Sequence, residues 1–341
     1  MKLSRWVGLI GTSILGSGLT ACGSQANAAH QPKKIVIALS NSYIGNDWRT
    51  QMVNAFSAAA RTAKQQGQIS SFEVINSNNT ASEQVSQLDT LILKHVSAIV
   101  IDAASSTALN GVIAKAHNAG IPVISFDNVV TSPYAYKINY NLFRWGSDAA
   151  NYIVKRLHGS GNVVLVRGIA GTPVDQSIYK GWMSVLSKHP GIKVVGSVYG
   201  NWTEATAQSK VASLIPSLPH INAILAQGSG EGYGAIQAFK AAGRSTPLVF
   251  GGNSGYFLHW WAKQSKATHY TTKSESNTPG VGGAAFYVAL SVVKGVHVPH
   301  SMTMPLLTIT QKTLSQYSNI PLTDVASPKY TYTWVKSHLL K

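Results

Sequence analysis

Carboxylate, carboxamide and tryptophan side chains follow most of the short apolar runs in this chain, and such groups suit the binding of polyhydroxylated solutes. Carboxylates and amides form paired hydrogen bonds with neighbouring hydroxyls, whereas planar rings pack against C–H faces. The His and Cys residues lack metal-ligand spacing and no G-x-S-x-G motif occurs, so we predict no metal site and no catalytic residue. The candidate binding residues are Asn41, Trp48, Arg49, Asp102, Asp127, Asn128, Gln176, Trp202, Ser229, Asn253 and Ser274.

Arg49 differs from the other candidates because it lies at the expected start of a helix, where a cation opposes the helix dipole. This mismatch favours a role in ligand binding. Structural roles stay open for three others. Asp102 and Asp127 could cap the helices that follow them, and Trp202 could belong to the core.

Short apolar runs alternate with amphipathic stretches along the whole chain, which predicts parallel sheets with crossover helices. The pattern restarts near residue 142, so we expect two successive doubly wound α/β units that form two similar lobes. In such sheets, ligands bind beyond the carboxyl ends of the strands, where the candidates lie. Strands are expected at 35–39, 72–75, 98–101, 122–126, 162–166, 193–198, 223–226, 248–250 and 267–271, with a strand-like run at 330–334. Helices are expected at 48–66, 81–94, 107–118, 142–157, 175–188, 203–215, 230–242, 256–263 and 278–294.

Several of these segments together resemble the ribose-binding protein family, the solute receptors of sugar importers of the ATP-binding-cassette (ABC) type. The resemblance covers roughly residues 35–305. It rests on the Asn after the first strand, the Asp after Pro-Val-Ile-Ser-Phe, the Gly-Ile-Ala-Gly-Thr segment at 168–172 and the segment at 226–243. The Gly-Asn-Asp-Trp-Arg stretch at 45–49 is similar to the branch that includes furanose-sugar receptors.

The resemblance implies the type I periplasmic binding protein fold, with two lobes joined by a hinge of three strands. Crossings are expected near 139–141, 274–276 and 307–308. The N-lobe would comprise 33–140 plus 276–306. The C-lobe would comprise 141–275 plus 307–341, including a C-terminal extension packed on a lobe or on the hinge.

The resemblance also implies roles for individual residues. Asn41 matches the polar residue after the first strand, Trp48 and Arg49 match the stacking and hydrogen-bonding pair of the furanose branch, and Asp127 matches the carboxylate that binds adjacent hydroxyls. Asp102 matches a position where the family often has Asn, and Trp202 matches the second-lobe aromatic. Asn253 stands where Asp is usual, and Ser274, or Glu275 beside it, lies near the usual Gln at the lobe crossover.

Three positions depart from the family pattern and indicate a neutral ligand other than ribose. Asn128 and Gln176 stand where the family usually has Arg, and Gly228-Ser229 replaces the usual Asn-Asp. These changes predict a roomier and less charged cleft.

The first 22 residues have the pattern of an export signal that ends in a lipobox. Lys2 and Arg5 precede an apolar stretch at 6–19, and Leu19-Thr20-Ala21-Cys22 follows. We expect Cys22, the only cysteine of the chain, to become the lipidated N-terminus, with 23–32 as a tether. This places the protein outside the cytoplasm, anchored to a membrane by lipid. The alternative is an ordinary signal peptide with a chance Cys.

The net charge of +16 reflects a shortage of acids, because 28 Lys and Arg face only 12 Asp and Glu. The basic residues are scattered, whereas a nucleic-acid-binding protein would concentrate them in a stripe, so no nucleic-acid partner is expected. Carboxylates lose their charge in acid, and we interpret the shortage as adaptation of the surface to an acidic medium. Attraction to an anionic membrane or wall is the alternative.

The leading functional hypothesis is a solute-binding lipoprotein of an ABC-type importer. It would trap a neutral monosaccharide or polyol between its lobes as a monomer and present it to a membrane permease. A sensory receptor for a signalling sugar is an alternative. A dinucleotide-dependent enzyme is disfavoured, although 230–235 imitates G-x-G-x-x-A, because the next strand ends in Asn253 rather than an acid. No cofactor is therefore expected.

Overall fold

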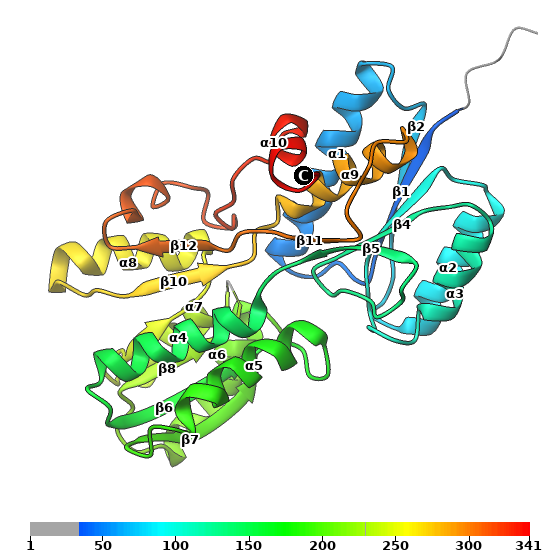
Figure 1. The fold of residues 1–341 in the computed structure, drawn as a ribbon. Helices are drawn as coiled ribbons and strands as arrows, with labels where there is room; N and C mark the ends of the chain where they lie inside the picture. The colour runs from blue at the N-terminus through cyan, green and yellow to red at the C-terminus, as the bar shows by residue number, and fades with distance from the viewer. Residues whose placement is uncertain (1–33, 229) are drawn as a thin grey trace, which may run out of the picture. The chain divides into compact units, whose positions relative to one another are not determined.

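The computed structural model describes residues 34–228 and 230–341, so the predictions for the export signal, the tether, Cys22 and Ser229 lie outside the described residues. The first lobe is built on a parallel six-stranded sheet of order β11-β5-β4-β3-β1-β2 (Figure 1). Its strands are β1 Val36–Asn41, β2 Ser71–Asn76, β3 Ala98–Asp102, β4 Val123–Phe126, β5 Ala135–Asn139 and β11 Ser301–Thr303. Its helices are α1 Asp47–Gln65, α2 Ala81–Leu93, α3 Asn110–Asn118 and α9 Val281–Val293.

Alternation along β1 explains why helices cover both faces of this sheet. Successive strand side chains point to opposite faces. Ile37 and Leu39 are buried in the cluster formed with α1 and α9, whereas Ala38 is buried in the cluster formed with α2 and α3. A strand buried on both sides has a continuous apolar run, which is the pattern that the sequence shows.

The second lobe repeats this arrangement around a parallel four-stranded sheet of order β7-β6-β8-β9. Its strands are β6 Gly161–Arg167, β7 Ile192–Tyr199, β8 Ala223–Ala226 and β9 Leu248–Phe250. Apolar side chains of α4 and α5 pack on one face of the sheet, and those of α6 and α7 pack on the other. The helices are α4 Leu142–Arg156, α5 Pro173–Leu186, α6 Glu204–Leu214, the 3-10 turn Ile215–Ser217, α7 Glu231–Ala241 and α8 Gly255–Thr268.

Three crossings connect the two sheets, as expected for the fold (Figure 1). The first leads from β5 into α4. The second is β10 (Lys273–Ser276), which leads into α9, and the third leads from β11 into β12 (Leu307–Thr310). β10 and β12 form an antiparallel pair, and Ser274 is also bridged to Gly251 at the end of β9.

Two predicted strands are wrong. The run at 267–271 is not a strand, because α8 continues to Thr268 and ends at His269 in the left-handed conformation, and the strand follows as β10. The run at 330–334 enters helix α10 (Tyr332–His338) instead, since the Thr331 side chain caps its first turn.

The C-terminal segment contacts both lobes. A short 3-10 turn at Leu314–Gln316 follows β12, and Val325 forms a bridge with Ser254 before α8. The Tyr330 hydroxyl then lies 3.0 Å from Thr278 Oγ1, and α10 packs on α9.

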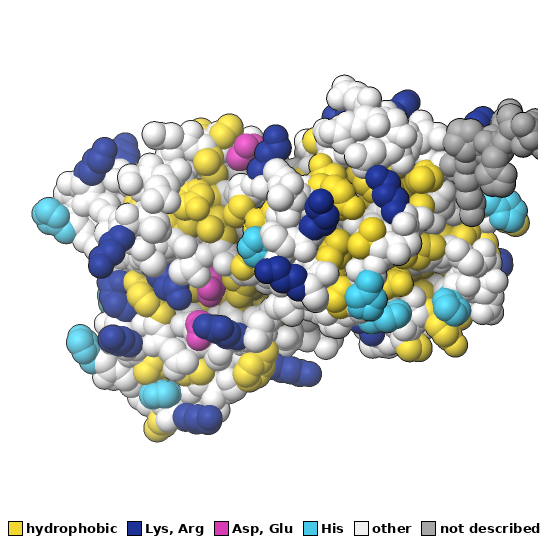
Figure 2. Space-filling model, turned by 45° about the horizontal axis from the view of Figure 1, so that its top comes forward, with side chains coloured by type: hydrophobic (Ala, Val, Ile, Leu, Met, Phe, Trp, Pro, Cys, Tyr) yellow, Lys and Arg dark blue, Asp and Glu magenta, His cyan; other side chains and the backbone are white. Residues whose placement is uncertain are grey.

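On the face shown in Figure 2, basic side chains are scattered rather than gathered in a stripe. Of the described residues, 34–228 and 230–341, none belongs to a helix long and apolar enough to cross a membrane.

Candidate functional site

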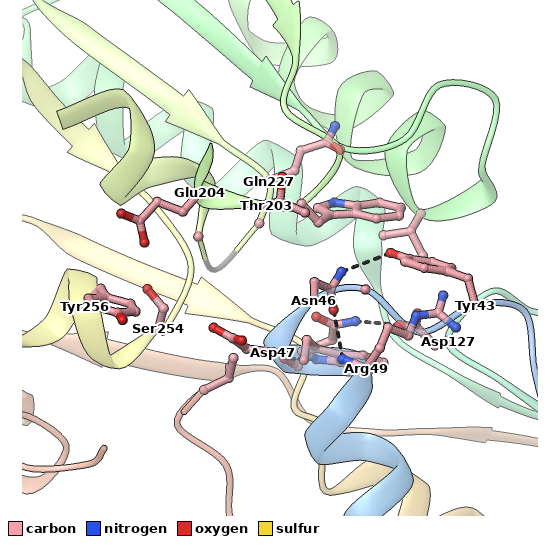
Figure 3. A pocket seen from close by; sticks show the side chains of 18 of the residues that line it. Tyr43, Asn46, Asp47, Arg49, Asp127, Thr203, Glu204, Gln227, Ser254 and Tyr256 are labelled. Carbon is pink, nitrogen blue, oxygen red and sulfur yellow. Dashed lines mark hydrogen bonds between the residues drawn. The ribbon is translucent and has the colours of Figure 1, made fainter. Parts of the chain in front are cut away.

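A cavity of about 220 Å³ lies where the carboxyl ends of the strands of both sheets face each other (Figure 3). The first lobe contributes the loop after β1, the start of α1 and the end of β4. The second contributes the loops after β7 and β8, and the crossing after β10 adds one residue. Polar and aromatic side chains that line it include Tyr43, Asn46, Asp47, Trp48, Arg49, Asp127, Trp145, Trp202, Thr203, Glu204, Gln227, Ser254, Tyr256 and Asn277.

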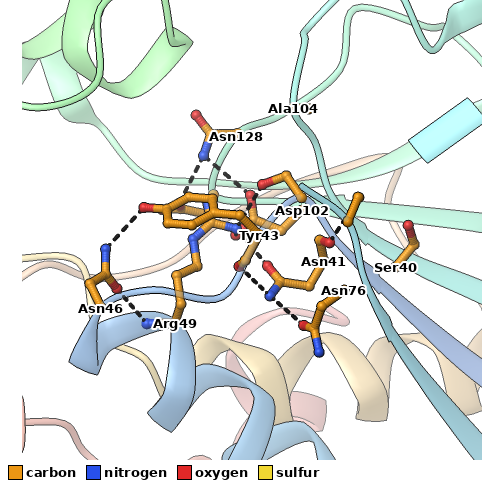
Figure 4. A network of polar contacts seen from close by, with 12 residues as sticks. Ser40, Asn41, Tyr43, Asn46, Arg49, Asn76, Asp102, Ala104 and Asn128 are labelled. Carbon is orange, nitrogen blue, oxygen red and sulfur yellow. Dashed lines mark hydrogen bonds and ion pairs between the residues drawn. The ribbon is translucent and has the colours of Figure 1, made fainter. Parts of the chain in front are cut away.

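Arg49 is held from behind by three side chains (Figure 4). Its Nη1 lies 2.6 Å from Asp102 Oδ2 and donates to Asn41 Oδ1 (2.7 Å) and Ser42 Oγ (3.1 Å). All three contacts use Nη1, so the rest of the guanidinium fork can face the cavity that Arg49 lines. The Asp102 carboxylate also offsets the unfavourable position of this cation at the start of α1.

The start of α1 is fixed locally as well. Asn46 is the N-cap, and its side chain accepts a hydrogen bond from the Arg49 backbone N–H (2.8 Å). Asn41 donates to Asn76 Oδ1 (2.8 Å) and to the Tyr43 carbonyl (2.6 Å), which ties the end of β1 to the end of β2 and to the loop. The guanidinium carbon of Arg49 lies 4.7 Å from the centre of the Tyr43 ring. The charged group is therefore preorganised rather than free to rotate.

Asp127 is the carboxylate that faces the cavity from the end of β4. Its backbone is left-handed, with a φ of 55°, and its side chain accepts hydrogen bonds from Asn277 and Asn128. Burial, reinforced by the negative charge of Asp102, raises the pKa of Asp127 to about 7, although Arg49 opposes this shift. Near neutral pH the group therefore exists in both protonation states.

Aromatic rings form much of the remaining wall. Trp48 and Tyr43 come from the first lobe, and Trp145, Trp202 and Tyr256 from the second. The Trp48 indole N–H donates to the Asn277 carbonyl (3.3 Å), so this ring is attached to the crossing after β10. Rings on both sides suit the C–H faces of a small solute.

Gln227 fixes the end of β8 beside the cavity. Its Oε1 accepts from the Gly168 N–H (2.9 Å), and its Nε2 donates to the Asp175 carbonyl (3.1 Å). The amide thus joins the loops that follow β6 and β8.

The structure separates the predicted site residues into three groups. Trp48, Arg49, Asp127 and Trp202 line the cavity, and Asn41, Asp102 and Asn128 stand behind them in direct contact. Asn253, Ser274 and Gln176 lie elsewhere. Ser274 Oγ donates to Asn253 Oδ1 (2.6 Å) and Asn253 Nδ2 to the Leu307 carbonyl (2.8 Å), which joins β9, β10 and β12, and exposed Gln176 donates to the Gly171 carbonyl (3.2 Å).

Sequence reasoning did not select Tyr43, Asn46, Gln227 or Asn277. The first three lie in the strand-end segments that supplied other candidates, so position alone could have found them. Asn277 follows β10, which lies at the crossing expected near 274–276, whereas the strand itself is predicted too early, at 267–271. Among the residues that the structure describes, no group of His, Cys, Asp or Glu could hold a metal ion.

Comparison with known proteins agrees with this fold. The sequence profile of the periplasmic binding protein domain matches residues 37–296. The xylitol-binding protein of Mycolicibacterium smegmatis is 30% identical over 256 residues, which cover 73% of this chain and 70% of that protein. The D-ribose/D-allose-binding protein of Pseudomonas aeruginosa is 27% identical over 67% of this chain and 74% of its own.

Among solved structures, an ABC transporter solute binding protein from Thermobispora bispora superimposes with a TM-score of 0.83. It is 33% identical, and the match covers 89% of this chain and 94% of that protein. The agreement extends over both lobes.

Proposed function

Because this chain belongs to the periplasmic binding protein family, we propose that it is the solute receptor of an ABC-type importer and binds a neutral monosaccharide or polyol between its lobes. One observation carries the proposal. A single cavity brings a fixed arginine and a carboxylate from one lobe against a tryptophan of the other. The family acts outside the cytoplasm, and its named relatives are binding proteins rather than enzymes.

The chemistry of the cavity favours a neutral ligand with several hydroxyl groups. The free N–H groups of Arg49 can donate to hydroxyl oxygens, and Asp127 can accept from two adjacent hydroxyls. The positive charge of Arg49 is already paired with Asp102, so no uncompensated cation awaits an anionic group. Trp48 and Trp202 offer ring faces to the C–H surfaces of the same ligand.

Ligand binding would also set the position of the lobes. Only a ligand that contacts both lobes stabilises the closed arrangement relative to an open one. We place the hinge at the crossings near 139–141, 274–276 and 307–308, and propose that the closed monomer docks on a membrane permease.

We further propose that Cys22 carries a lipid that anchors the protein to a membrane surface. The support is the residue pattern before Cys22. Mass spectrometry of the purified membrane fraction should find a lipidated N-terminal Cys22. The Cys22→Ser variant should be released as soluble protein, and an unmodified Cys22 in the native protein would contradict the anchor.

The function is tested by calorimetric titration and thermal unfolding with xylitol, D-ribose, D-allose, myo-inositol and a furanose sugar. A ligand at 100 times its Kd stabilises the folded protein by about 2.7 kcal/mol, which raises the Tm by about 5 °C or more. Asp127→Ala should abolish the response, whereas Gln176→Ala, at an exposed position outside the cavity, should retain it. If none of these compounds releases heat on titration or raises the Tm, the sugar-receptor proposal would be overturned.

A further inference from the structure

Trp202 has a strained backbone at the edge of the cavity. Both Asn201 and Trp202 adopt the left-handed conformation, with φ angles of 53° and 55°. Bulky residues rarely occupy this region, and two in succession persist only where the surroundings hold them. Contacts with neighbouring residues must therefore hold Asn201 and Trp202 in this conformation.

The buried carboxylate of Glu231 provides one such hold. Glu231 is the first residue of α7, and its Oε1 accepts the Trp202 backbone N–H (2.8 Å) while its Oε2 accepts the Gly228 N–H (2.7 Å). One side chain therefore ties the loop after β7 to the loop after β8. Glu231 does not line the cavity, so it reaches the ligand site through Trp202 and Gly228, which do.

Three glycines leave the room that this arrangement needs. A Cβ at Gly168 would lie 2.1 Å from Trp202 Cε2, and one at Gly228 would lie 2.7 Å from Trp202 Cδ1. A Cβ at Gly200 would lie 2.7 Å from Glu231 Oε1. The indole thus occupies a slot between the loops after β6 and β8, and a side chain at either edge would occupy the same space.

We infer that Glu231 is a positioning residue that, together with the slot formed by Gly168 and Gly228, fixes the Trp202 ring in the cavity. The effect on ligand affinity rests on the proposed function, whereas the positioning of the ring does not. Glu231 acts through the Trp202 backbone rather than by touching ligand.

The positioning is tested first without ligand, by ¹⁹F NMR of protein labelled with 5-fluorotryptophan. The chain has eight Trp residues, and Trp202→Phe identifies the Trp202 resonance. At pH 9, above the pKa of about 8 to which burial raises Glu231, Glu231→Gln should shift or broaden that resonance and leave the others in place, because the carboxylate accepts both backbone N–H groups and an amide nitrogen cannot accept. Glu275→Gln is the matched control, since Glu275 is a buried acid bonded to Thr308 in the hinge. An unchanged Trp202 resonance in Glu231→Gln would overturn the inference.

Ligand affinity then tests the consequence, with xylitol and D-ribose as probes. Glu231→Gln should weaken binding about tenfold in the native background and have no effect in the Trp202→Ala background. Gly168→Ala should behave in the same way, because the three atoms nearest to its added Cβ all belong to the Trp202 ring and Gly168 does not line the cavity. Gly111→Ala, where a Cβ meets nothing within 4 Å, should leave affinity unchanged.

An equal loss in both backgrounds would contradict a role through Trp202. Failure of both sugars to bind the native protein would count against the proposed ligand class, while the NMR result would still decide the positioning role.

Discussion

The two walls of the cavity are built on different principles. The wall from the six-stranded lobe fixes its charged side chains by contacts with other side chains, where Asp102 and Asn41 hold Arg49 and amides hold Asp127. The wall from the four-stranded lobe depends on backbone geometry, with Trp202 in a left-handed conformation between glycine loops. In the first wall, specific polar side chains can bind the hydroxyl groups of a ligand. In the second wall, the backbone conformation places an aromatic ring where it can contact the ligand.

The largest expected effect is on the charged wall, from Asp102→Ala. This change leaves the Arg49 guanidinium buried without its carboxylate, which costs about 3–5 kcal/mol of the free energy of unfolding and should abolish ligand binding. Urea unfolding and calorimetric titration measure both effects. The matched control is Asp89→Ala, which removes an exposed ion pair with Lys115 and should cost no more than about 1 kcal/mol. Equal stability of the two variants would contradict the greater importance of the buried Arg49–Asp102 pair.

The next effect concerns the pH dependence of affinity. Asp127 has a raised pKa of about 7, so its carboxylate form becomes rare as the pH falls from 8 to 5. A ligand that donates hydroxyl hydrogens to the carboxylate should then bind more weakly, by up to about 100-fold, because only the ionised fraction is competent. Titrations between pH 5 and pH 8 test this, and Asp127→Asn should remove the dependence. Tighter binding at pH 5 would show that the ligand prefers the protonated acid.

A smaller loss is expected from Arg49→Lys, which keeps the charge and removes the fork. A lysine can pair with Asp102 but cannot also present fixed donors to the cavity, so affinity should fall by about tenfold with little change in Tm. Calorimetric titration at pH 7 gives the affinity. Undiminished affinity would mean that Arg49 acts only as a buried charge.

The last expected effect is on stability, and it comes from the ring-bearing wall. Burial raises the pKa of Glu231 from 4.5 to about 8, although the backbone N–H groups of Trp202, Gly228 and Gln227 oppose the shift. The contribution of Glu231 to the free energy of unfolding is fully present below its pKa in the unfolded chain, near 4.5, and is lost as the pH rises through about 8. The ligand-free Tm should therefore fall between pH 5 and pH 8, at about 2–4 °C per kcal/mol lost.

Glu231→Gln should have a shallower profile than the native protein. A Tm that rises across this range in both proteins to the same extent would contradict the assignment. Greater stability at the acidic end would agree with the shortage of acids on the surface as an adaptation to an acidic medium.

The charged wall was more predictable from the sequence than the ring-bearing wall. Asp127 follows β4 directly and Arg49 lies in the first turn of α1, after the loop from β1, and a parallel sheet brings such positions to one edge. The residue pattern does not indicate whether a side chain at a strand end points into the cavity or toward a neighbouring side chain. Asn41 and Asp102 are therefore among the candidates, although they contact Arg49 from behind instead of lining the cavity. Asn253 and Ser274 bond each other for the same reason. Asn277 was missed because α8 extends five residues beyond the predicted helix, so the strand predicted at 267–271 lies at 273–276, where the crossing was expected.

The other wall could not be deduced from residue types. Trp202 was selected, but nothing in the residue pattern indicated that its backbone is left-handed or that Glu231 lies beneath it. Both depend on three loops that meet only after the sheet has formed. The tail shows the same limit, since alternating Thr and aromatic residues at 330–334 suggested a strand, whereas capping by Thr331 and the burial of Val335 and Leu339 favour a helix.

Docking of α10 on α9 has a practical consequence for sensor design. The described chain begins in β1 and ends after α10, and both belong to the lobe with the six-stranded sheet (Figure 1). Two fluorophores attached beside β1 and on α10 would therefore move together, and their fluorescence would not change when a ligand fills the cavity. A reporter needs one dye at an end of the chain and the other on the far lobe, for example at exposed Lys193 in β7.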